Sequence, residues 1–420
     1  MSSSEVPEST DGRTQLCVVG LGYIGLPTAV VFARSGWDVL GVDVSERIVE
    51  MVNAGRLPFV EEGLEQALGD AVRSGRLRAS GAPVHADVFI VSVPTPFVGE
   101  HQADLRYVDT AADEVAEVLR GGELVVLEST VPPGATEHMA KRILRLRPEL
   151  EGRVDFAHAP ERVLPGRIMA ELRTNDRIVG GLTPAATQRA REVYASFCTG
   201  TISTTDARTA ELSKLAENSF RDVNIAFANE LSLICARLGI DVWELISLAN
   251  HHPRVDILQP GPGVGGHCIA VDPWFIVSAD PQDSRLIRTA REVNDGKPRW
   301  VIGRVLGALD ALALGSPRVA VLGLAFKADI DDLRESPSVE IARELALSRP
   351  GVAFDVVEPN IATLPEQLVS LDNVALMDLD RALADADVVT LLVDHRQFRD
   401  LDPDRLSGKA VVDTRGVWRR

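Results

Sequence analysis

The sequence predicts an α/β protein with two Rossmann-like, doubly wound domains, joined by a long central helix and a helical middle domain. In both halves of the 420-residue chain, short apolar runs alternate with helical stretches, which is the pattern of parallel sheets covered by helices. A glycine-rich turn follows the first apolar run. A proline-free stretch with apolar residues at helical spacing, residues 205–250, separates the two halves and predicts one long and one shorter helix.

The first elements form a βαβ unit. A strand is expected at residues 16–19, then the turn G-L-G-Y-I-G over residues 20–25, a helix over 27–35 and a strand over 37–42 that ends on Asp43. A G-x-G-x-x-G turn between strand and helix, with an acid about 20 residues later, is typical of dinucleotide binding.

Each residue of this pattern has a physical reason. Gly20 permits the tight turn, Gly22 lets backbone N–H groups approach a pyrophosphate, and Gly25 lets the helix pack on the strand. Asp43 can accept hydrogen bonds from an unphosphorylated ribose and would repel a 2′-phosphate, so NAD is favoured over NADP. The alternative is a glycine turn with a purely structural role.

Further strands and a helix extend the alternation. The strands are expected at residues 87–93, 123–128, 318–323, 352–357, 387–393 and 410–413, and the helix at 337–347. Thr95 and Thr130 come after two of the strands, where ligands of parallel sheets collect. Either threonine could instead cap a helix.

Four segments are predicted along the chain. They are a disordered polar tail over residues 1–13, an NAD-binding Rossmann domain over 14–204, a central helical and dimerisation domain with a cysteine loop over 205–300, and a Rossmann-like domain over 301–420. The last domain lacks the complete glycine fingerprint, so a nucleotide other than the dinucleotide is its expected ligand.

Composition excludes several classes of function. The chain has 44 basic and 61 acidic residues and a net charge of −17, which argues against binding nucleic acid or an anionic membrane surface. No apolar run is long enough to cross a bilayer. The four cysteines form no C-x-x-C pair, so we expect no disulfide framework, no metal site and a reducing cytoplasm.

One cysteine differs from the others. Cys17, Cys198 and Cys235 lie in apolar surroundings and are expected to be buried, whereas Cys268 follows the glycine-rich segment G-P-G-V-G-G-H. A thiol there is accessible and, as a thiolate, can attack a carbonyl. Asp272, four residues later, could order a water or a lysine, or cap a turn.

Upstream, Lys214 and Asn218 are spaced i, i+4, and Arg221 follows on roughly the same side of the predicted helix. Both Lys214 and Asn218 can donate to an oxygen that acquires charge, which suits an acid/base and oxyanion pair. A solvated helix face is the other interpretation.

The motifs together resemble the nucleotide-sugar 6-dehydrogenases, which include the UDP-glucose and GDP-mannose dehydrogenases. They are, in chain order, G-L-G-Y-I-G-L-P, V-P-T-P, E-S-T-V-P-P-G, P-E-R, E-L-S-K-L-x-E-N, G-P-G-V-G-G-H-C and F-K-x-D-x-x-D-x-R-E-S-P. The resemblance spans the chain from about residue 16 to residue 418. Its G-G-H-C segment is most similar to that of members acting on UDP-N-acetyl-D-mannosamine, and members acting on UDP-N-acetylglucosamine share it.

The resemblance implies a four-electron, NAD-dependent oxidation of the sugar C6 hydroxyl to a carboxylate, through a cysteine thiohemiacetal and thioester, for surface polysaccharide synthesis. UDP-N-acetylglucosamine or UDP-glucose are alternative substrates, and a non-catalytic NAD-binding regulatory module is an alternative of another class. A homodimer is expected.

The resemblance also implies roles for individual residues. The implied catalytic residues are Cys268, Lys214, Asn218, Asp272, Glu161 and Thr130. The implied cofactor contacts are Gly20, Gly22, Tyr23, Ile24, Gly25, Asp43, Arg47, Thr95, Thr130 and Arg334. The implied contacts to the UDP-sugar are Arg162, Val163, Lys214, Asn218, Arg221, His252, Arg254, Gly265, Lys327 and Arg415, with His252 and Arg254 reaching across a dimer interface.

Overall fold

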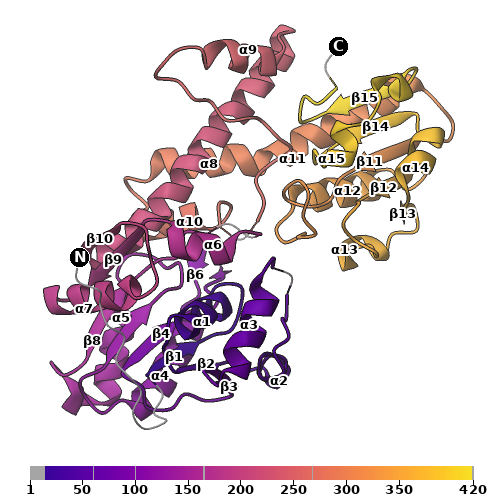
Figure 1. The fold of residues 1–420 in the computed structure, drawn as a ribbon. Helices are drawn as coiled ribbons and strands as arrows, with labels where there is room; N and C mark the ends of the chain where they lie inside the picture. Colours follow the sequence, from indigo (N-terminus) through magenta and orange to yellow (C-terminus); the bar gives the residue numbers. More distant parts are fainter. Residues whose placement is uncertain (1–14, 60, 100, 164–165, 267, 419–420) are drawn as a thin grey trace. The chain divides into compact units, whose positions relative to one another are not determined.

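The structure is a computed structural model, and it describes residues 15–418 except 60, 100, 164–165 and 267. The predicted tail over residues 1–13 and His267 of the glycine-rich loop therefore lie outside the described residues. The chain separates into two compact units, Met1–Ala216 and Glu217–Arg420. Each unit holds a sheet built mainly from parallel strands together with helices (Figure 1), which confirms the predicted α/β fold class.

The first unit is built on an eight-stranded sheet in the order β10-β9-β8-β7-β4-β1-β2-β3. Its strands are β1 (Leu16–Val19), β2 (Val39–Val42), β3 (Leu77–Ser80), β4 (Val88–Val91), β7 (Leu124–Leu127), β8 (Asp155–His158), β9 (Arg177–Gly181) and β10 (Ile202–Asp206), beside a small hairpin of β5 (Phe97–Val98) and β6 (Gln102–Ala103). The run β3-β2-β1-β4-β7-β8 is parallel throughout, which is the strand order of dinucleotide-binding domains.

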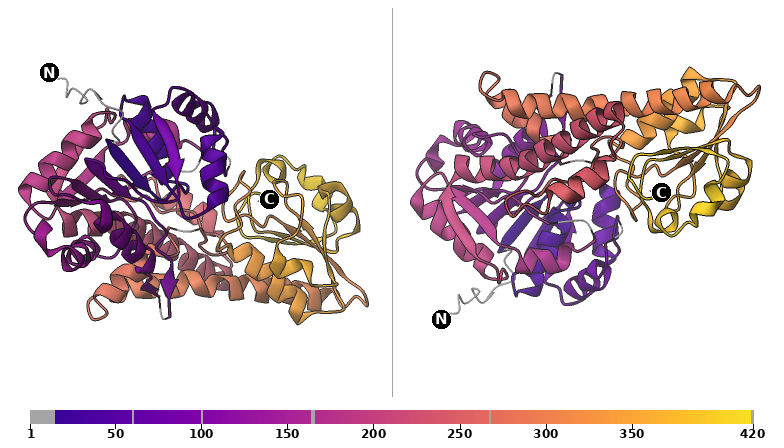
Figure 2. Two further views of the ribbon diagram at one scale, coloured as in Figure 1. Left: turned by 90° about the horizontal axis from the view of Figure 1, so that it is seen from below. Right: turned by 90° about the horizontal axis from the view of Figure 1, so that it is seen from above.

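Helices cover both faces of this sheet (Figure 2). They are α1 (Gly25–Arg34), α2 (Glu46–Asn53), α3 (Leu64–Arg73), α4 (Arg106–Val118), α5 (Ala135–Leu146), α6 (Ile168–Thr174) and α7 (Pro184–Ala195), with a 3₁₀ turn at Pro148–Leu150. Because successive side chains of a strand point to opposite faces, Leu16 and Val18 of β1 pack with α1, α3, α6 and α7, whereas Cys17 and Val19 pack with α4 and α5. Burial on both faces explains the unbroken apolar runs of the sequence.

The proline-free stretch forms two helices, as predicted. They are α8 (Ala207–Leu238), within which the chain passes from the first unit to the second, and α9 (Val242–Ala249). A second long helix, α11 (Arg285–Leu312), was not predicted. It follows the short helix α10 (Asp272–Ala279). Helix α11 runs through residue 300, where the sequence analysis divides the central domain from the last.

The second unit contains a five-stranded, fully parallel sheet in the order β13-β12-β11-β14-β15. Its strands are β11 (Arg318–Leu322), β12 (Ala353–Val357), β13 (Val374–Leu376), β14 (Val388–Leu391) and β15 (Ala410–Asp413), and its further helices are α12 (Pro337–Ser348), α13 (Glu366–Val369), α14 (Leu379–Asp385), α15 (Arg396–Arg399) and a 3₁₀ turn at Pro403–Leu406. This order repeats the central arrangement of the first sheet and gives the second Rossmann-like domain.

The cysteines follow the prediction with one correction. Cys17 and Cys235 are buried and Cys268 is exposed, but Cys198 is only partly buried. The reason is its position just beyond α7, where its thiol faces the carbonyl oxygen of Asn175 at 3.5 Å in a connecting segment. Within the described residues, no helix is long and apolar enough to span a membrane.

Candidate active site

The glycine turn after β1 is shaped for close backbone contact. Gly20 has φ of +96°, and a Cβ atom there would lie 2.3 Å from the carbonyl oxygen of Ser92. A Cβ atom on Gly25 would lie 1.9 Å from the carbonyl oxygen of Gly20, whereas one on Gly22 would meet nothing within 4 Å. The turn therefore needs glycine at positions 20 and 25 for its own packing, and it leaves open space over Gly22 at the start of α1. This arrangement fits the pyrophosphate of a dinucleotide.

Asp43 stands at the end of β2, beside the same turn. Its Oδ2 accepts a hydrogen bond from the Leu21 N–H at 3.0 Å, and its Oδ1 accepts one from the Ser45 N–H at 2.9 Å. The carboxylate is thus fixed by backbone donors at the position where Rossmann domains bind the ribose.

The other predicted cofactor contacts of this region lie around the turn. Tyr23 stacks on Phe59 with ring centroids 4.2 Å apart, and Ile24 directly precedes α1. Arg47 is exposed on α2, where its guanidinium lies 3.8 Å from the Met51 sulfur. This contact is weak and lies within the same helix.

The turns after β4 and β7 are joined to one another. The Thr95 hydroxyl donates to the Thr130 carbonyl oxygen at 2.7 Å, and the Ser129 hydroxyl donates to the Val93 carbonyl oxygen at 2.7 Å. The structure thus brings Thr95 and Thr130 together. Neither caps a helix, because the residues that precede α4 and α5 are Leu105 and Gly134.

Glu161 follows β8 and belongs to a buried ion pair that the sequence analysis did not find. Its Oε2 is 2.6 Å from a guanidinium nitrogen of Arg177, and its Oε1 accepts from the Arg162 N–H at 2.7 Å. The Arg177 guanidinium lies 4.8 Å from the centre of the Tyr194 ring. Glu161 is 8% exposed and Arg177 is 3% exposed. Removing either charge would leave the other buried without its partner.

A second buried carboxylate, Glu128, lies in the same cluster. It accepts hydrogen bonds from the Thr28 hydroxyl of α1 and the Tyr194 hydroxyl of α7, each at 3.1 Å. Burial and the nearby negative charge of Glu161 raise the pKa of Glu128 to about 7, and the Arg177 charge opposes that rise. One guanidinium therefore serves two carboxylates, and the cluster holds a proton more tightly than free glutamates do.

Arg162 and Val163 complete this segment. The Arg162 guanidinium donates to the Asp176 carbonyl oxygen at 3.1 Å, and Val163 packs against the core of the first unit. The segment around Glu161 is thus tied to the neighbouring β9 by several contacts.

Helix α8 carries the predicted acid/base residues. Glu211 fixes the start of the helix by accepting from the Gly134 N–H at 2.5 Å and from the Thr136 N–H at 2.7 Å. Lys214 and Asn218 follow one turn apart, and Asn218 is buried, which excludes the solvated-face interpretation for that residue. Arg221 is exposed.

Asn218 contacts the segment that carries the thiol. Its side-chain N–H donates to Asp272 Oδ2 at 2.5 Å, and Asp272 is 3% exposed as the first residue of α10. The Asp272 N–H in turn donates to the Cys268 carbonyl oxygen at 2.8 Å. The Asp272 carboxylate is thus bound to Asn218, one turn from the exposed Cys268.

The glycine-rich loop packs tightly against other segments of the second unit. A Cβ atom on Gly265 would lie 2.4 Å from the Glu335 carbonyl oxygen, and one on Gly263 would lie 2.9 Å from the Pro337 ring. At the start of the loop, a Cβ atom on Gly261 would lie 2.8 Å from the Arg415 guanidinium. The glycines here make room for neighbouring groups, which is a physical reason for their number.

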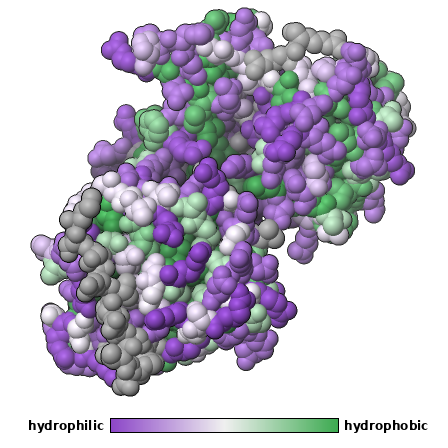
Figure 3. Space-filling model, viewed as in Figure 1, coloured by the Kyte–Doolittle hydropathy of each residue, from purple (hydrophilic) through white to green (hydrophobic). Residues whose placement is uncertain are grey.

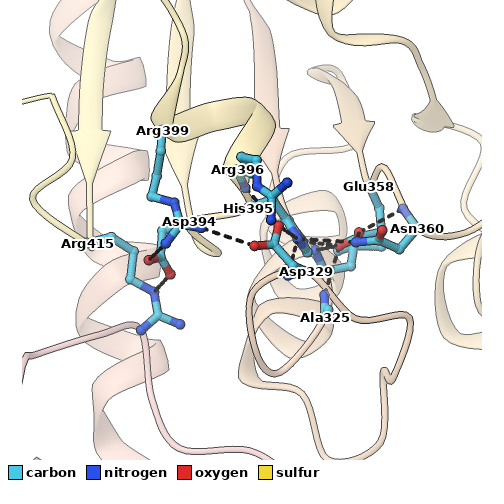
Figure 4. Close-up of polar contacts among 10 residues, drawn as sticks. Ala325, Asp329, Glu358, Asn360, Asp394, His395, Arg396, Arg399 and Arg415 are labelled. Atoms are coloured by element: carbon cyan, nitrogen blue, oxygen red, sulfur yellow. Dashed lines mark hydrogen bonds and ion pairs between the residues drawn. The ribbon is translucent and has the colours of Figure 1, made fainter. Parts of the chain in front are cut away.

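Basic residues of the second Rossmann-like domain surround the ends of its strands. Arg415 donates to the Leu392 carbonyl oxygen at 3.0 Å and lies 3.6 Å from Asp394 (Figure 4). Lys327 is exposed on the segment after β11. Arg334 pairs with Asp332 through two guanidinium nitrogens.

His252 and Arg254 lie apart from these groups in the sequence, on the exposed segment after α9. The Arg254 N–H lies 3.3 Å from a ring nitrogen of His252. They share no hydrogen bond with Cys268 or Asp272 among the contacts of the described residues.

The acid at the end of β12 shows how the two Rossmann-like domains differ. Glu358 accepts from the Leu324 and Ala325 N–H groups at 2.7 and 3.0 Å, as Asp43 accepts from Leu21, but it is also bound to the buried His395 at 3.0 Å (Figure 4). Burial alone would raise the pKa of Glu358, and the bonds from His395 and the backbone outweigh it and lower that pKa. Both backbone N–H groups and a histidine ring therefore bind the Glu358 carboxylate within the protein.

Three consecutive parts of the chain match one family. Residues 14–198 match the NAD binding domain of the UDP-glucose/GDP-mannose dehydrogenase family, residues 208–296 its central domain, and residues 320–420 its UDP binding domain. The chain belongs to this family. Membership confirms the resemblance seen in the sequence, the assignment to an NAD-dependent dehydrogenase and the choice of NAD as cofactor.

Individual family members are similar over nearly the full length. A UDP-N-acetyl-D-mannosamine dehydrogenase of Escherichia coli (strain K12) is 54% identical, over 96% of this chain and 99% of that protein. An NDP-N-acetyl-D-galactosaminuronic acid dehydrogenase of Ralstonia nicotianae is also 54% identical, over 97% of each chain. The solved structure of a UDP-D-ManNAc dehydrogenase from Pyrococcus horikoshii has a TM-score of 0.87 at 38% identity, over 97% of this chain and 96% of that one.

Proposed function

We propose that the protein oxidises the C6 hydroxyl of UDP-N-acetyl-D-mannosamine to the carboxylate, with Cys268 as nucleophile. The observation that carries the chemistry is the exposed Cys268 thiol, one turn from a buried carboxylate that is bound to Asn218. A two-electron alcohol oxidation needs no thiol, whereas capture of an aldehyde does. The named relative from Escherichia coli supports the choice of sugar.

In the first oxidation, the chain has to remove a proton from the C6 hydroxyl while a hydride leaves C6. When bound, NAD accepts one hydride in each of the two oxidation steps. Lys214 is the group we assign to the hydroxyl proton. Asn218 uses one side-chain N–H for Asp272 and has a second with which to stabilise the oxygen as it gains charge.

In the second stage, the Cys268 thiolate adds to the aldehyde carbon and forms a C–S bond, which gives a thiohemiacetal. Loss of a second hydride from C6 and of the hydroxyl proton yields a thioester. Water then breaks the C–S bond, so that the carboxylate leaves and the thiol is restored. We assign Glu161 to activation of this water, with Thr130 and Asp272 as polar groups near the reacting centre.

The remaining predicted contacts divide by ligand. In the first unit, the glycine turn and Asp43 hold the pyrophosphate and ribose of NAD, while Arg47, Tyr23 and Thr95 contribute from its surroundings. Arg334 is assigned as a further contact to the cofactor. The diphosphate and sugar of the substrate are assigned to basic and polar groups, namely Arg162, Val163, Arg221, His252, Arg254, Gly265, Lys327 and Arg415.

The proposal includes a homodimer through α8. Phe220, Phe227, Ile234 and Leu238 are exposed at spacings of seven, seven and four, so they form one apolar stripe. Hydrophobic side chains reach the surface over the part of the second unit that contains α8 and α9 (Figure 3). A second copy of the chain, with the same stripe, is the partner that suits it. Phe227→Asp should therefore shift the molar mass measured by light scattering to that of a monomer, whereas Leu347→Glu on α12 should not.

A sugar panel tests the substrate. We expect kcat/KM for UDP-N-acetyl-D-mannosamine to exceed that for UDP-N-acetylglucosamine and UDP-glucose by at least about 100-fold. A sugar that does not match the site leaves buried polar groups of the protein without hydrogen-bond partners, and this lowers kcat/KM strongly. UDP-N-acetyl-D-galactosamine belongs in the panel, because the relative from Ralstonia nicotianae is equally similar. A higher value for any other sugar would replace the proposed substrate, and no turnover with any of them would favour a regulatory NAD-binding module.

We place the reaction in the cytoplasm, where its product serves surface polysaccharide synthesis. An exposed nucleophilic thiol such as Cys268 persists in a reducing compartment and is readily oxidised outside it.

A further inference from the structure

Two buried amides on α8 hold the two ends of the segment that carries Cys268. Asn218 binds Asp272 at its end, and Asn229 Oδ1 accepts from the Gly261 N–H at 2.9 Å at its beginning. The two asparagines are eleven residues apart, which is about three helical turns, so they lie on one stripe of the helix. Helix α8 therefore contacts both ends of the segment that carries Cys268.

The orientation of the Asn229 amide is set by a chain of buried hydrogen bonds. Arg291 donates to Asp222 Oδ1 at 2.7 Å, and Asn294 Nδ2 donates to the same oxygen at 2.8 Å. The Asn294 oxygen must therefore face the other way, and it accepts from Asn229 Nδ2 at 2.8 Å. Each of these four residues is at most 1% exposed. Because a carboxylate only accepts, the direction of every bond follows from Asp222, and the Asn229 oxygen is left for Gly261.

Glycine-rich loops have many accessible conformations. The conformations that place the thiol away from the aldehyde carbon must be disfavoured for the thiol to react. Close contacts at Gly263 and Gly265 restrict the middle of the loop, but backbone position at its start depends on the bond to Asn229. A displacement of about 1 Å at a reacting atom can lower a rate by roughly 100-fold. A buried amide that fixes the start of the loop can therefore affect the reaction rate through the position of the Cys268 thiol.

We propose that Asn229, oriented by Asn294 and Asp222, is a positioning residue that fixes the glycine-rich loop so that Cys268 captures the aldehyde before it escapes. This inference rests on the proposed role of Cys268. It goes further by assigning a task to a network far along the helix from Lys214 and Asn218.

The first test replaces Asn229 by leucine, which has a similar size and no polar atoms. We expect kcat to fall by about tenfold to 100-fold and free aldehyde to appear, trapped with semicarbazide, while NAD affinity stays within about twofold. Asn224→Leu is the matched control, because Asn224 lies on the same helix and its side chain donates to the Phe220 carbonyl oxygen of that helix. A purely structural role for Asn229 would lower the melting temperature but release no aldehyde.

A second test uses the direction of the bonds. Asn229→Asp leaves an acceptor for Gly261 but forces the Asn294 amide to turn its oxygen toward Asp222, so it should behave like Asn229→Leu.

The outcomes separate the two claims. Uronate formation by Cys268→Ala at the normal rate would overturn the proposed nucleophile itself. If Cys268→Ala is inactive but Asn229→Leu has normal kcat for each NAD-binding molecule and releases no aldehyde, only the positioning role is wrong. Normal kcat in the Asn229→Asp variant would contradict the assigned bond directions, because that variant places a second acceptor opposite the Asn294 oxygen.

Discussion

Asn218 and Asp272 form a buried hydrogen bond of 2.5 Å between a 32-residue helix and the first residue of a short one. The contact ties the helix that presents Lys214, one turn earlier, to the segment that presents Cys268, one turn before Asp272. Residues 54 positions apart in the chain are thereby fixed to one another at the point where the proposed chemistry takes place.

Asp272→Asn should damage catalysis more than folding. The variant keeps an oxygen that can accept from Asn218 but removes the carboxylate's negative charge. The bond that holds Asn218, with its second N–H directed at a developing oxyanion, is therefore weakened. We expect kcat to fall by about 100-fold or more, as for the loss of an oxyanion donor, with NAD affinity unchanged when measured by titration. Asp280→Asn at the exposed end of α10 is the control. An Asp272→Asn enzyme with normal kcat would show that the contact is only structural.

The glycine turn offers a paired test of fold against binding. Gly25→Ala would place a Cβ atom 1.9 Å from the Gly20 carbonyl oxygen, so α1 has to move away from β1. We expect it to lose NAD binding and about 2 kcal/mol or more of unfolding free energy, as for other overpacked positions. Gly22→Ala meets nothing within 4 Å. It should unfold like the wild type and still bind NAD at least about tenfold more weakly; normal affinity would place the pyrophosphate elsewhere.

The strands were the most predictable part of the fold. Residues 16–19 and 410–413 were expected as strands at the bounds that β1 and β15 have, because apolar runs between polar turns leave little choice of register. Helix α11 was missed because Pro298 lies inside it, and proline removes a donor and predicts a break. The helix continues because Val301, Val305 and Leu309 are buried against the second sheet, and this packing outweighs the local preference.

Those residues of the candidate site that lie in a local sequence motif could be predicted. Those that only the tertiary structure brings together could not. The glycine turn, Asp43 and Cys268 stand in local patterns whose spacing has a chemical meaning. Arg177 and Asn229 do not, because each gains its partner through the tertiary structure, 16 residues away for Glu161 and 32 for Gly261. An arginine at the start of a strand, or an asparagine within a helix, gives no sign in the sequence of what it will contact.

The buried Glu128 should leave a signature in the pH dependence of stability. Its pKa is about 7 in the folded protein against an ordinary value of 4.5, so the folded state holds the proton more tightly. The stability that this provides is complete below about pH 4.5 and is lost as the pH rises through 7. Glu128→Gln removes the effect, so its unfolding free energy relative to wild type should rise by up to about 3 kcal/mol between pH 4.5 and 8 in urea titrations. A difference that is constant with pH would mean that Glu128 is ionised throughout.

The central claim is that one active site carries out both oxidations while the sugar stays bound to Cys268. Counting NADH formed for each UDP-N-acetyl-D-mannosamine consumed, with the product identified by mass, tests it most directly. The account predicts two NADH for each uronate and no free aldehyde in the wild type, and loss of uronate in Cys268→Ala with NAD binding largely intact. One NADH for each sugar, or two in the absence of the thiol, would contradict it.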